Sequence, residues 1–456
     1  MATPGLTIRR LTRAVCLACC GLGLMSAAHA ETLAQTFALA QQHNPALRSA
    51  QADYQAALSG IGLARSRLLP QLVAGAGISA NAHDNSENPL LTKFGMPTSW
   101  NYTERDINLV ATQSLYQPGD RIGVEQAELA ARIAYLKFVQ QNQTLMLQVA
   151  SRYFDVLAAQ DTLRSLEEQQ KAVVQQRAAA QANFDAGNGT IVDVRDAQAR
   201  VDLTSAQTLA AKNQLQLAQT NLGQVVGASL QGALAPLSPD ASLRPPAGDL
   251  HDWVRKAEEH NLGVDQARLG VQLARLSAKK ARTGDLPTIS AYARVDHDAT
   301  SVGGPLFPFG NRANMASIGV QLRWALVTGG AVQSDVEQTA QLLDKSQADL
   351  DAARLGAAQQ ARAAYLNLQS SLAQVKALDA AIASSRSSLQ ANETGFKVGM
   401  RVNIDVLNAL SQLFETQRQA DRARYDVVVN ALRLKDAAGV LSPSDVEALN
   451  ALLAKP

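Results

Sequence analysis

Two aspartates stand at matching positions behind two glycine-containing turns, and they are the first candidates for chemistry in this chain. Asp193 follows Gly187 by six residues, and Asp405 follows Gly399 by six residues. Each aspartate leads into a long stretch without glycine. A carboxylate in such a position can cap the N-terminus of a helix. Where several copies converge on one axis, it can instead attract cations and repel anions, as charged rings do in pores.

Patterns for catalysis or cofactor binding do not occur elsewhere in the sequence. The six histidines are scattered without the spacing of metal ligands. Neither a glycine-rich phosphate loop nor a nucleophile motif is found, so a secreted hydrolase has no site. We therefore expect no enzyme activity, no cofactor and no metal. The formal net charge of +2 gives no electrostatic case for a nucleic-acid partner.

The first thirty residues are interpreted as a signal peptide for export. Three arginines precede an apolar run, residues 14–24, that is too short to span a bilayer as a mature helix. Ala28-His29-Ala30 fits a small-x-small cleavage site, so the mature chain would start at Glu31. A lipid-anchored cysteine is the alternative, although the residues before the later two cysteines fit a lipidation site poorly. All three cysteines lie inside this segment: Cys16, Cys19 and Cys20.

The remainder of the chain is duplicated. His43-Asn44-Pro45 recurs as His260-Asn261-Leu262, at an offset of 217 residues (44 to 261). The aspartate-containing turns recur at an offset of 212 residues (193 to 405). A period above 200 residues is too long for a solenoid repeat. We therefore expect two structural repeats, residues 31–239 and 240–456, with the same elements in each.

Each repeat is predicted to contain a very long helix that reverses at glycines. Residues 124–186 contain no glycine or proline, and such a helix would be on the order of 95 Å long. Glycine permits the positive φ that a tight reversal needs, and Gly187, Gly189 and Gly399 mark the turns. Ala- and Gln-rich helices with one imperfect apolar seam are typical of packed hairpins. We place these hairpins at about residues 119–226 and 330–438.

Alternation of apolar and polar residues predicts four strands, two in each repeat. The period of two places them at about residues 72–82, 104–116, 287–297 and 313–327. One apolar face over about ten residues is typical of a transmembrane barrel strand, so the lipid bilayer is an expected partner. Four strands cannot close a barrel, and every backbone group at membrane depth must be paired. The chain must therefore share a barrel with other copies, either two in all, giving eight strands, or three, giving twelve.

Several short motifs follow one another in order along both halves. They are Glu31-Thr32-Leu33, Asn44-Pro45-x-Leu47, Leu68-Leu69-Pro70-Gln71-Leu72, Gly399-x-Arg401-x-x-x-Asp405-Val406-Leu407, Ala423-Arg424-Tyr425 and Ala448-Leu449-Asn450. Together they resemble the TolC family of outer-membrane efflux and secretion channels over nearly all of residues 31–456. The resemblance implies an α+β membrane protein and a homotrimer. Its twelve-stranded transmembrane β-barrel, four strands per chain, would continue into a long α-helical periplasmic barrel, with the C-terminal segment in an equatorial belt.

The resemblance also implies a function and partners. The protein would be a passive channel across the outer membrane and periplasm, for efflux of small molecules, type I protein secretion, or both. An inner-membrane pump or ABC exporter would open it through a periplasmic adaptor (membrane fusion) protein that docks at Gly187, Gly189 and Gly399. The alternative, a soluble periplasmic coiled-coil adaptor, explains the helices but leaves the four strands unexplained.

The resemblance assigns gate roles at the periplasmic constriction to five residues. Asp405 matches an acidic ring, and Asn408 stands where the family has a second acid. Asp193 matches a partner from the first hairpin and Arg401 matches a latch arginine, whereas Phe396 replaces a latch tyrosine and has no hydroxyl. We therefore expect a weakened ring and no latch hydrogen bond from position 396, while the charges of Asp193 and Arg401 still allow an ion pair.

Overall fold

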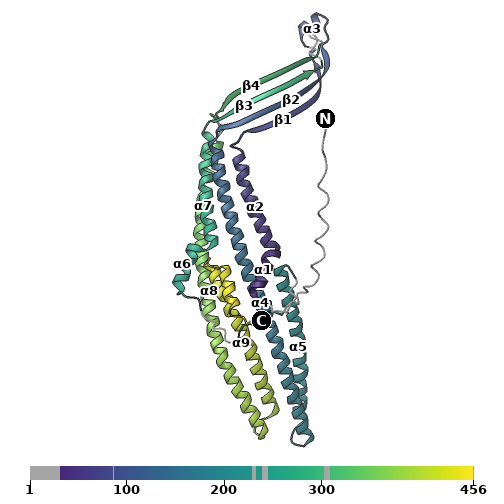
Figure 1. The fold of residues 1–456 in the computed structure, drawn as a ribbon, viewed down its shortest axis with the longest axis vertical. Coiled ribbons are helices and arrows are strands. Elements are labelled where there is room, and N and C mark those ends of the chain that lie inside the picture. Colours follow the sequence, from purple (N-terminus) through teal and green to yellow (C-terminus); the bar gives the residue numbers. More distant parts are fainter. Residues whose placement is uncertain (1–30, 86, 229–232, 239–244, 302–308, 455–456) are drawn as a thin grey trace, which may run out of the picture.

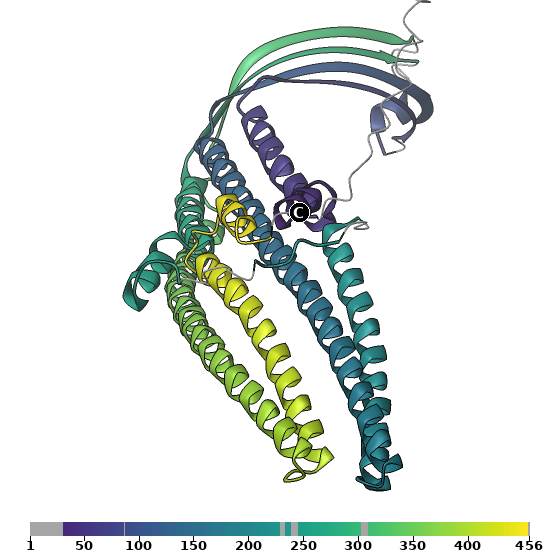
Figure 2. The ribbon, with the colours of Figure 1, turned by 60° about the horizontal axis from the view of Figure 1, so that its bottom comes forward.

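The computed structural model describes residues 31–85, 87–228, 233–238, 245–301 and 309–454. The predicted signal peptide, residues 1–30, lies outside the described residues. The molecule is elongated, with one β-sheet at one end, two helical hairpins at the other, and shorter helices between them (Figures 1 and 2).

The elements follow nearly the same order in the two halves. The first half consists of α1 (Leu33–His43), α2 (Pro45–Ser66), β1 (Gln71–Asp84), α3 (Pro89–Lys93), β2 (Ser99–Tyr116), α4 (Pro118–Asp185) and α5 (Ile191–Val226). The second consists of α6 (Leu250–His260), α7 (Leu262–Ala281), a 3-10 turn (Arg282–Asp285), β3 (Thr288–Thr300), β4 (Asn311–Arg323), α8 (Ala331–Lys397), α9 (Asn403–Ala437) and α10 (Pro443–Asn450).

Two helices of unusual length each form one arm of a hairpin. α4 has 68 residues and α8 has 67, so each is about 100 Å long. α4 begins at Pro118, before Gly119 and Gly123 and therefore before the glycine-free run. Proline is favourable at the first position of a helix, because the N–H that it lacks would have no partner within the helix. α5 packs against α4, and α9 against α8. No helix in the described ranges has a stretch long and apolar enough to cross a membrane.

The four strands form one antiparallel sheet in the order β1-β2-β3-β4, which leaves β1 and β4 as its edges. β1 and β2 continue beyond the predicted limits to the pair Asp84↔Ser99, because ladder hydrogen bonds hold polar residues as well as apolar ones. The predicted fourth strand is too long. β4 ends at Arg323, opposite Thr288, and β3 supplies no partner beyond that residue. A short helix, α3, lies in the loop between β1 and β2.

The largest core lies midway along the molecule, where α1, α4, α5, α9 and the C-terminal segment meet. Tyr153 is fully buried there, and its hydroxyl lies 3.0 Å from the Glu31 carbonyl oxygen and 2.8 Å from that of Ala235. Burial raises the pKa of Tyr153, so the phenol remains a hydrogen-bond donor at any ordinary pH. This side chain therefore ties the start of the described chain and the segment after α5 to α4.

Two asparagines at equivalent positions fasten the helix breaks of the two halves. Asn44 caps α2 by accepting from the Leu47 N–H at 3.0 Å, and its amide donates to the Val225 carbonyl at 2.8 Å. Asn261 caps α7 by accepting from the Gly263 N–H at 2.9 Å, and its amide donates to the Ala437 carbonyl at 3.0 Å. We call these two contacts the helix-break junctions. Each binds the end of a hairpin to a helix that leads to the sheet.

A glycine completes each junction. Gly227 and Gly439 have φ values of 76° and 70°, just after the ends of α5 and α9. A Cβ at Gly227 would lie 2.8 Å from the His43 carbonyl oxygen, and one at Gly439 would lie 2.1 Å from that of His260. Both conformation and space therefore require glycine at these two positions.

Candidate functional site at the hairpin tips

The first hairpin turns through a glycine and restarts with a helix cap. Asn188 N–H donates to the Asn183 carbonyl at 2.8 Å, and Gly187 adopts a φ of 77°. The Thr190 hydroxyl accepts from the Asp193 N–H at 3.2 Å, while the Asp193 carboxylate accepts from the Thr190 N–H at 3.1 Å. Asp193 is therefore part of a capping box at the N-terminus of α5.

The second hairpin turns in the same way but restarts without a side-chain cap. Met400 N–H donates to the Gly395 carbonyl at 2.8 Å, and Gly399 has a φ of 76°. The residue that precedes α9 is Val402, which has no side chain able to cap it. Asp405 lies in the first turn of α9, where its charge complements the helix dipole.

The predicted ion pair between Asp193 and Arg401 is not made within the described chain. The Asp193 carboxylate is used by Thr190. Arg401 pairs instead with Asp405, one helical turn away, at 3.6 Å. Within one chain each of the two groups finds a partner nearer in sequence. An Asp193–Arg401 pair between neighbouring copies stays a prediction.

A buried asparagine joins the two tips instead. The Asn403 side chain is fully buried, donates to the Asp193 carbonyl at 3.2 Å and accepts from the Gln176 amide at 2.6 Å. A few residues further along, Arg200 of α5 donates to the Asn408 side chain at 2.7 Å. Asn408 is thus a contact between the hairpins. The sequence offers no signal for Asn403, Gln176 or Arg200, since polar residues on Gln-rich helices have no distinctive spacing.

An apolar cluster lies beneath these polar contacts. Its buried members come from α4, α5 and α9: Val173, Ala197, Leu407 and Leu410. Phe396, at the end of α8, is half-buried. The cluster holds α9, and with it Asp405, in a defined position relative to the first hairpin. The Asp405 side chain is 34% exposed and that of Arg401 is 60% exposed, so solvent reaches both charges.

The tips also expose apolar side chains. Five large hydrophobic side chains of the two turns are each more than two-fifths exposed to solvent. They are Ile191, Val192, Val398, Met400 and Val402, with exposed fractions from 46% at Ile191 to 79% at Met400. Exposed hydrophobic side chains gathered at one place commonly mark an interaction site.

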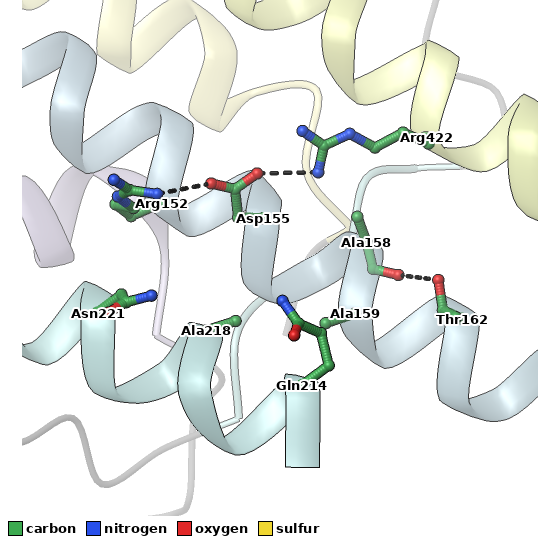
Figure 3. A pocket seen from close by; sticks show the side chains of 9 residues that line it. All are labelled: Arg152, Asp155, Ala158, Ala159, Thr162, Gln214, Ala218, Asn221 and Arg422. Atoms are coloured by element: carbon green, nitrogen blue, oxygen red, sulfur yellow. Dashed lines mark hydrogen bonds and ion pairs between the residues drawn. The ribbon is translucent and has the colours of Figure 1, made fainter. Parts of the chain in front are cut away.

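A cavity of about 330 Å³ lies higher up, between α4, α5 and α9 (Figure 3). Asp155 is flanked there by Arg152 at 3.4 Å and Arg422 at 2.8 Å (Figure 3). Arg422 also contacts Asp426 at 3.2 Å. The two cations and two anions compensate one another, so the cavity has no net charge that would select a charged ligand.

A buried polar cluster links α4 and α9 at a neighbouring level. The Tyr425 hydroxyl donates to Asp161 at 2.5 Å, and Arg164 pairs with the same carboxylate at 2.9 Å. Burial, and next the charge of Asp161, raise the pKa of Asp421 above its usual value. Burial and the hydrogen bond to Asp161 likewise raise the pKa of Tyr425. The cluster therefore favours protonated forms of Asp421 and Tyr425 in the folded state.

Comparison with known proteins gives a consistent result. The model of a family described as "Outer membrane efflux protein" matches residues 37–228 and 253–440, one match in each half. The chain is 32% identical over 438 residues to the outer membrane protein TolC of Salmonella enteritidis, covering 95% of this chain and 87% of that one. It is 29% identical over 420 residues to the alkaline protease secretion protein AprF of Pseudomonas aeruginosa, covering 90% of this chain and 84% of that protein.

The fold also matches a solved structure. The outer membrane protein VceC from Vibrio cholerae superposes with a TM-score of 0.73 at 18% identity, covering 89% of this chain and 96% of that one. At this identity the likeness concerns the fold alone.

Proposed function

Because the chain belongs to the outer membrane efflux protein family, we propose that three copies of it form a passive duct that crosses the outer membrane and extends through the periplasm. The protein is an outer-membrane channel for efflux or type I secretion. Relatives named for efflux and for protease secretion match at least 90% of this chain, so the duct serves small molecules, a secreted polypeptide, or both.

The open sheet is the observation that carries this proposal. β1 and β4 each have one side without a strand partner in the described chain, and the sheet exposes large apolar side chains such as Leu72, Ile107 and Ile318. In hydrocarbon each unpaired backbone group costs several kcal/mol, so the edges must pair with strands of other copies. Three copies supply twelve strands, an even number that closes a barrel wider than the eight-stranded minimum.

The two hairpins of each copy then become staves of a tunnel below the barrel. Their tips lie at the end of the molecule opposite the sheet (Figure 1). We place the gate there, with three Asp405 side chains around the axis. Because Arg401 lies 3.6 Å from Asp405 in the same chain, each acid of the ring is partly compensated. Asn408 contributes no charge and is occupied by Arg200.

The partners act at the tips. A periplasmic adaptor protein docks on the turns at Gly187, Gly189 and Gly399, where the exposed apolar side chains of the tips offer a surface. An inner-membrane pump or ABC exporter supplies the energy. The soluble adaptor that was the alternative fits less well, because it accounts neither for the family match nor for an apolar four-stranded sheet.

Assembly is tested on the protein extracted in detergent. We expect a native mass equal to three chains and, after reconstitution, discrete conductance steps in planar bilayers. A lone subunit that conducts no ions would overturn the proposed function.

The gate is tested by block with a multivalent cation added on the tip side. Asp405→Asn should raise the blocking concentration about tenfold, as the loss of ~1.4 kcal/mol of attraction would give. Arg401→Gln, which uncovers the same acid, should lower the blocking concentration. Asn408→Asp adds a second acid that Arg200 partly compensates, so it should lower the blocking concentration by less. Equal block in all four proteins would remove Asp405 from the gate while leaving the channel itself intact.

A further inference from the structure

The acidic side chains of three of the four strands all lie on one face of the sheet. Side chains alternate between faces along a strand, and paired residues share a face. By this rule every acidic residue of β2, β3 and β4 lies on one face, which we call the polar face: Glu104, Asp106, Asp296 and Asp298.

Contacts confirm the position of the polar face. A Cβ added at Gly77 would lie 2.3 Å from the Asp106 carboxylate, and one at Gly319 would lie 2.8 Å from the Tyr292 hydroxyl. Asp106 and Tyr292 therefore lie flat over glycines of the neighbouring strands. Arg294 pairs with Asp296 at 2.7 Å on this same face.

The opposite face carries two arginines in one row. Arg105 of β2 is paired with Ala299 of β3, and Ala299 is paired with Arg312 of β4. Two strand spacings separate the arginines, so their Cα atoms are about 10 Å apart. Both residues are exposed, and neither guanidinium has an ion-pair partner among the residues that the structure describes. We call Arg105, Ala299 and Arg312 the basic row.

An apolar band fills the same face on the side toward the helices. Its members pair across the sheet: Leu72, Ala74, Leu109, Ala111, Ala291, Ala293, Val295, Ile318, Val320 and Leu322. Between the band and the basic row, His297 Nδ1 lies 2.5 Å from the Asn314 side-chain oxygen. The face therefore changes from apolar through neutral polar to basic side chains along the strands.

The distance from the basic row to the far margin of the band matches a bilayer. The ten steps along β4 from Leu322 to Arg312 rise about 33 Å, and a barrel tilt near 40° reduces this to about 25 Å, the usual height of an apolar band. Just beyond Leu322, Trp324 is 55% exposed, as expected for a side chain at the other membrane interface. The basic row therefore lies at the interface farther from the helices.

We propose that the basic row binds the phosphate groups of lipid headgroups in the outer leaflet. This inference rests on the proposed function, because it requires the sheet to span the membrane. Guanidinium groups bind phosphate in a bidentate way, and arginines next to hydrocarbon without a counter-charge are costly. No acid of β2, β3 or β4 lies on the row's face, and the one acid of β1 on that face, Asp84, pairs with Ser99, six residues away from Arg105 along β2. The counter-charge therefore comes from the lipid. Three copies place six such arginines around the barrel.

Lipid binding to the detergent-extracted trimer tests the row, with native mass spectrometry as the readout. The probes are phosphatidate, whose headgroup is a phosphate monoester, and phosphatidylcholine with the same acyl chains. We expect the wild type to prefer phosphatidate by about 30-fold, since each arginine near the surface contributes about fivefold. Arg105→Gln and Arg312→Gln should each reduce the preference about fivefold, and the double variant should abolish it. If the double variant does not assemble, the two single variants decide.

Arg323→Gln is the matched control, because Arg323 lies on the same strand, on the polar face and at the other end. It should keep the full preference, and the double variant should keep the conductance of the wild type. An unchanged preference in the double variant would overturn the proposal, as would an equal loss in Arg323→Gln. Complete displacement of phosphatidate by inorganic phosphate at equal concentration would assign the row to soluble anions instead. Loss of the trimer and of conductance in the wild type would overturn the proposed function itself, a distinguishable failure.

Discussion

The helix-break junctions and the hairpin tips are both duplicated, yet only the junctions have remained alike. Asn44 and Asn261 make equivalent caps and equivalent hydrogen bonds to the ends of α5 and α9. At the tips, α5 begins with a capping box at Thr190, whereas α9 follows Val402 without a side-chain cap. The buried asparagine at the start of α9, Asn403, has no counterpart at the start of α5. Each junction connects the end of a hairpin to a helix that leads to the sheet, so its role is the same in both halves. The two tips differ, because the second tip places Asn403 against the first hairpin. Divergence at the tips is what a gate with distinct roles for its two hairpins would require.

Substitution of a junction glycine should reduce the free energy of unfolding more than any other change considered below. Gly439→Ala forces a side chain into the left-handed region and onto the His260 carbonyl, so we expect a loss of about 3–4 kcal/mol in stability. Gly399→Ala has the same φ problem but nothing within 4 Å of the new Cβ, so it should cost only about 1–2 kcal/mol. Thermal unfolding of the detergent-extracted protein compares the two. Equal losses would show that the close approach at the junction is not the reason for its glycine.

Removal of the asparagine side chains at the junctions should give the second-largest loss of stability. Asn261→Ala removes a helix cap and leaves the Ala437 carbonyl without its donor, so a loss of about 2 kcal/mol is expected. Asn44→Ala should cost a similar amount. If one substitution is neutral while the other is severe, the equivalence of the two junctions fails as an energetic statement. The same unfolding measurement applies.

The caps at the tips should respond in opposite directions. Thr190→Val removes a capping side chain and should cost about 1 kcal/mol, whereas Val402→Thr offers one to α9 and should gain about 0.5 kcal/mol. Hydrogen exchange of the first-turn amides of α5 and α9 reports each change locally. A loss of stability in Val402→Thr would mean that the apolar side chain at this position contributes more than a cap would.

The smallest effect concerns pH. The pKa of Asp421 is raised in the folded state, mainly by burial, so the folded chain binds the proton more tightly than the unfolded chain does. The resulting stability is full below the ordinary aspartate value near ~3.9 and is lost as pH rises through the folded value. Asp421→Asn should therefore gain stability relative to wild type as pH rises toward neutral. Asp426→Asn, which removes a carboxylate from a surface ion pair with Arg422, serves as the control and should show no such gain.

Local patterns were sufficient to predict several features of the fold. The glycine-free run predicted a helix that became the 68 residues of α4, and the alternating residues predicted four strands. The limits of the strands were less accurate, since a strand continues only while a neighbour pairs with it. Trp324 keeps the alternation but lies beyond the last pair, Thr288↔Arg323. At the hairpin tips, the position of Asp405 in the first turn of α9 could be predicted from Gly399, whereas its partner Arg401 could not. Within one chain, Asp193 and Arg401 make shorter-range contacts with Thr190 and Asp405 and do not pair with each other.

The sequence by itself determined the periodic features: two halves, long helices that reverse at glycines, and strands with one apolar face. These depend on residues close together in the chain, where backbone geometry alone sets the spacing. Only the tertiary structure decided which distant groups meet. Asn403 reaches the Asp193 carbonyl, and Arg105 aligns with Arg312 across β3. In the sequence Arg105 stands between Glu104 and Asp106, so its charge appears compensated. Strand alternation sends those acids to the other face, and sheet register then supplies a second arginine from more than 200 residues away.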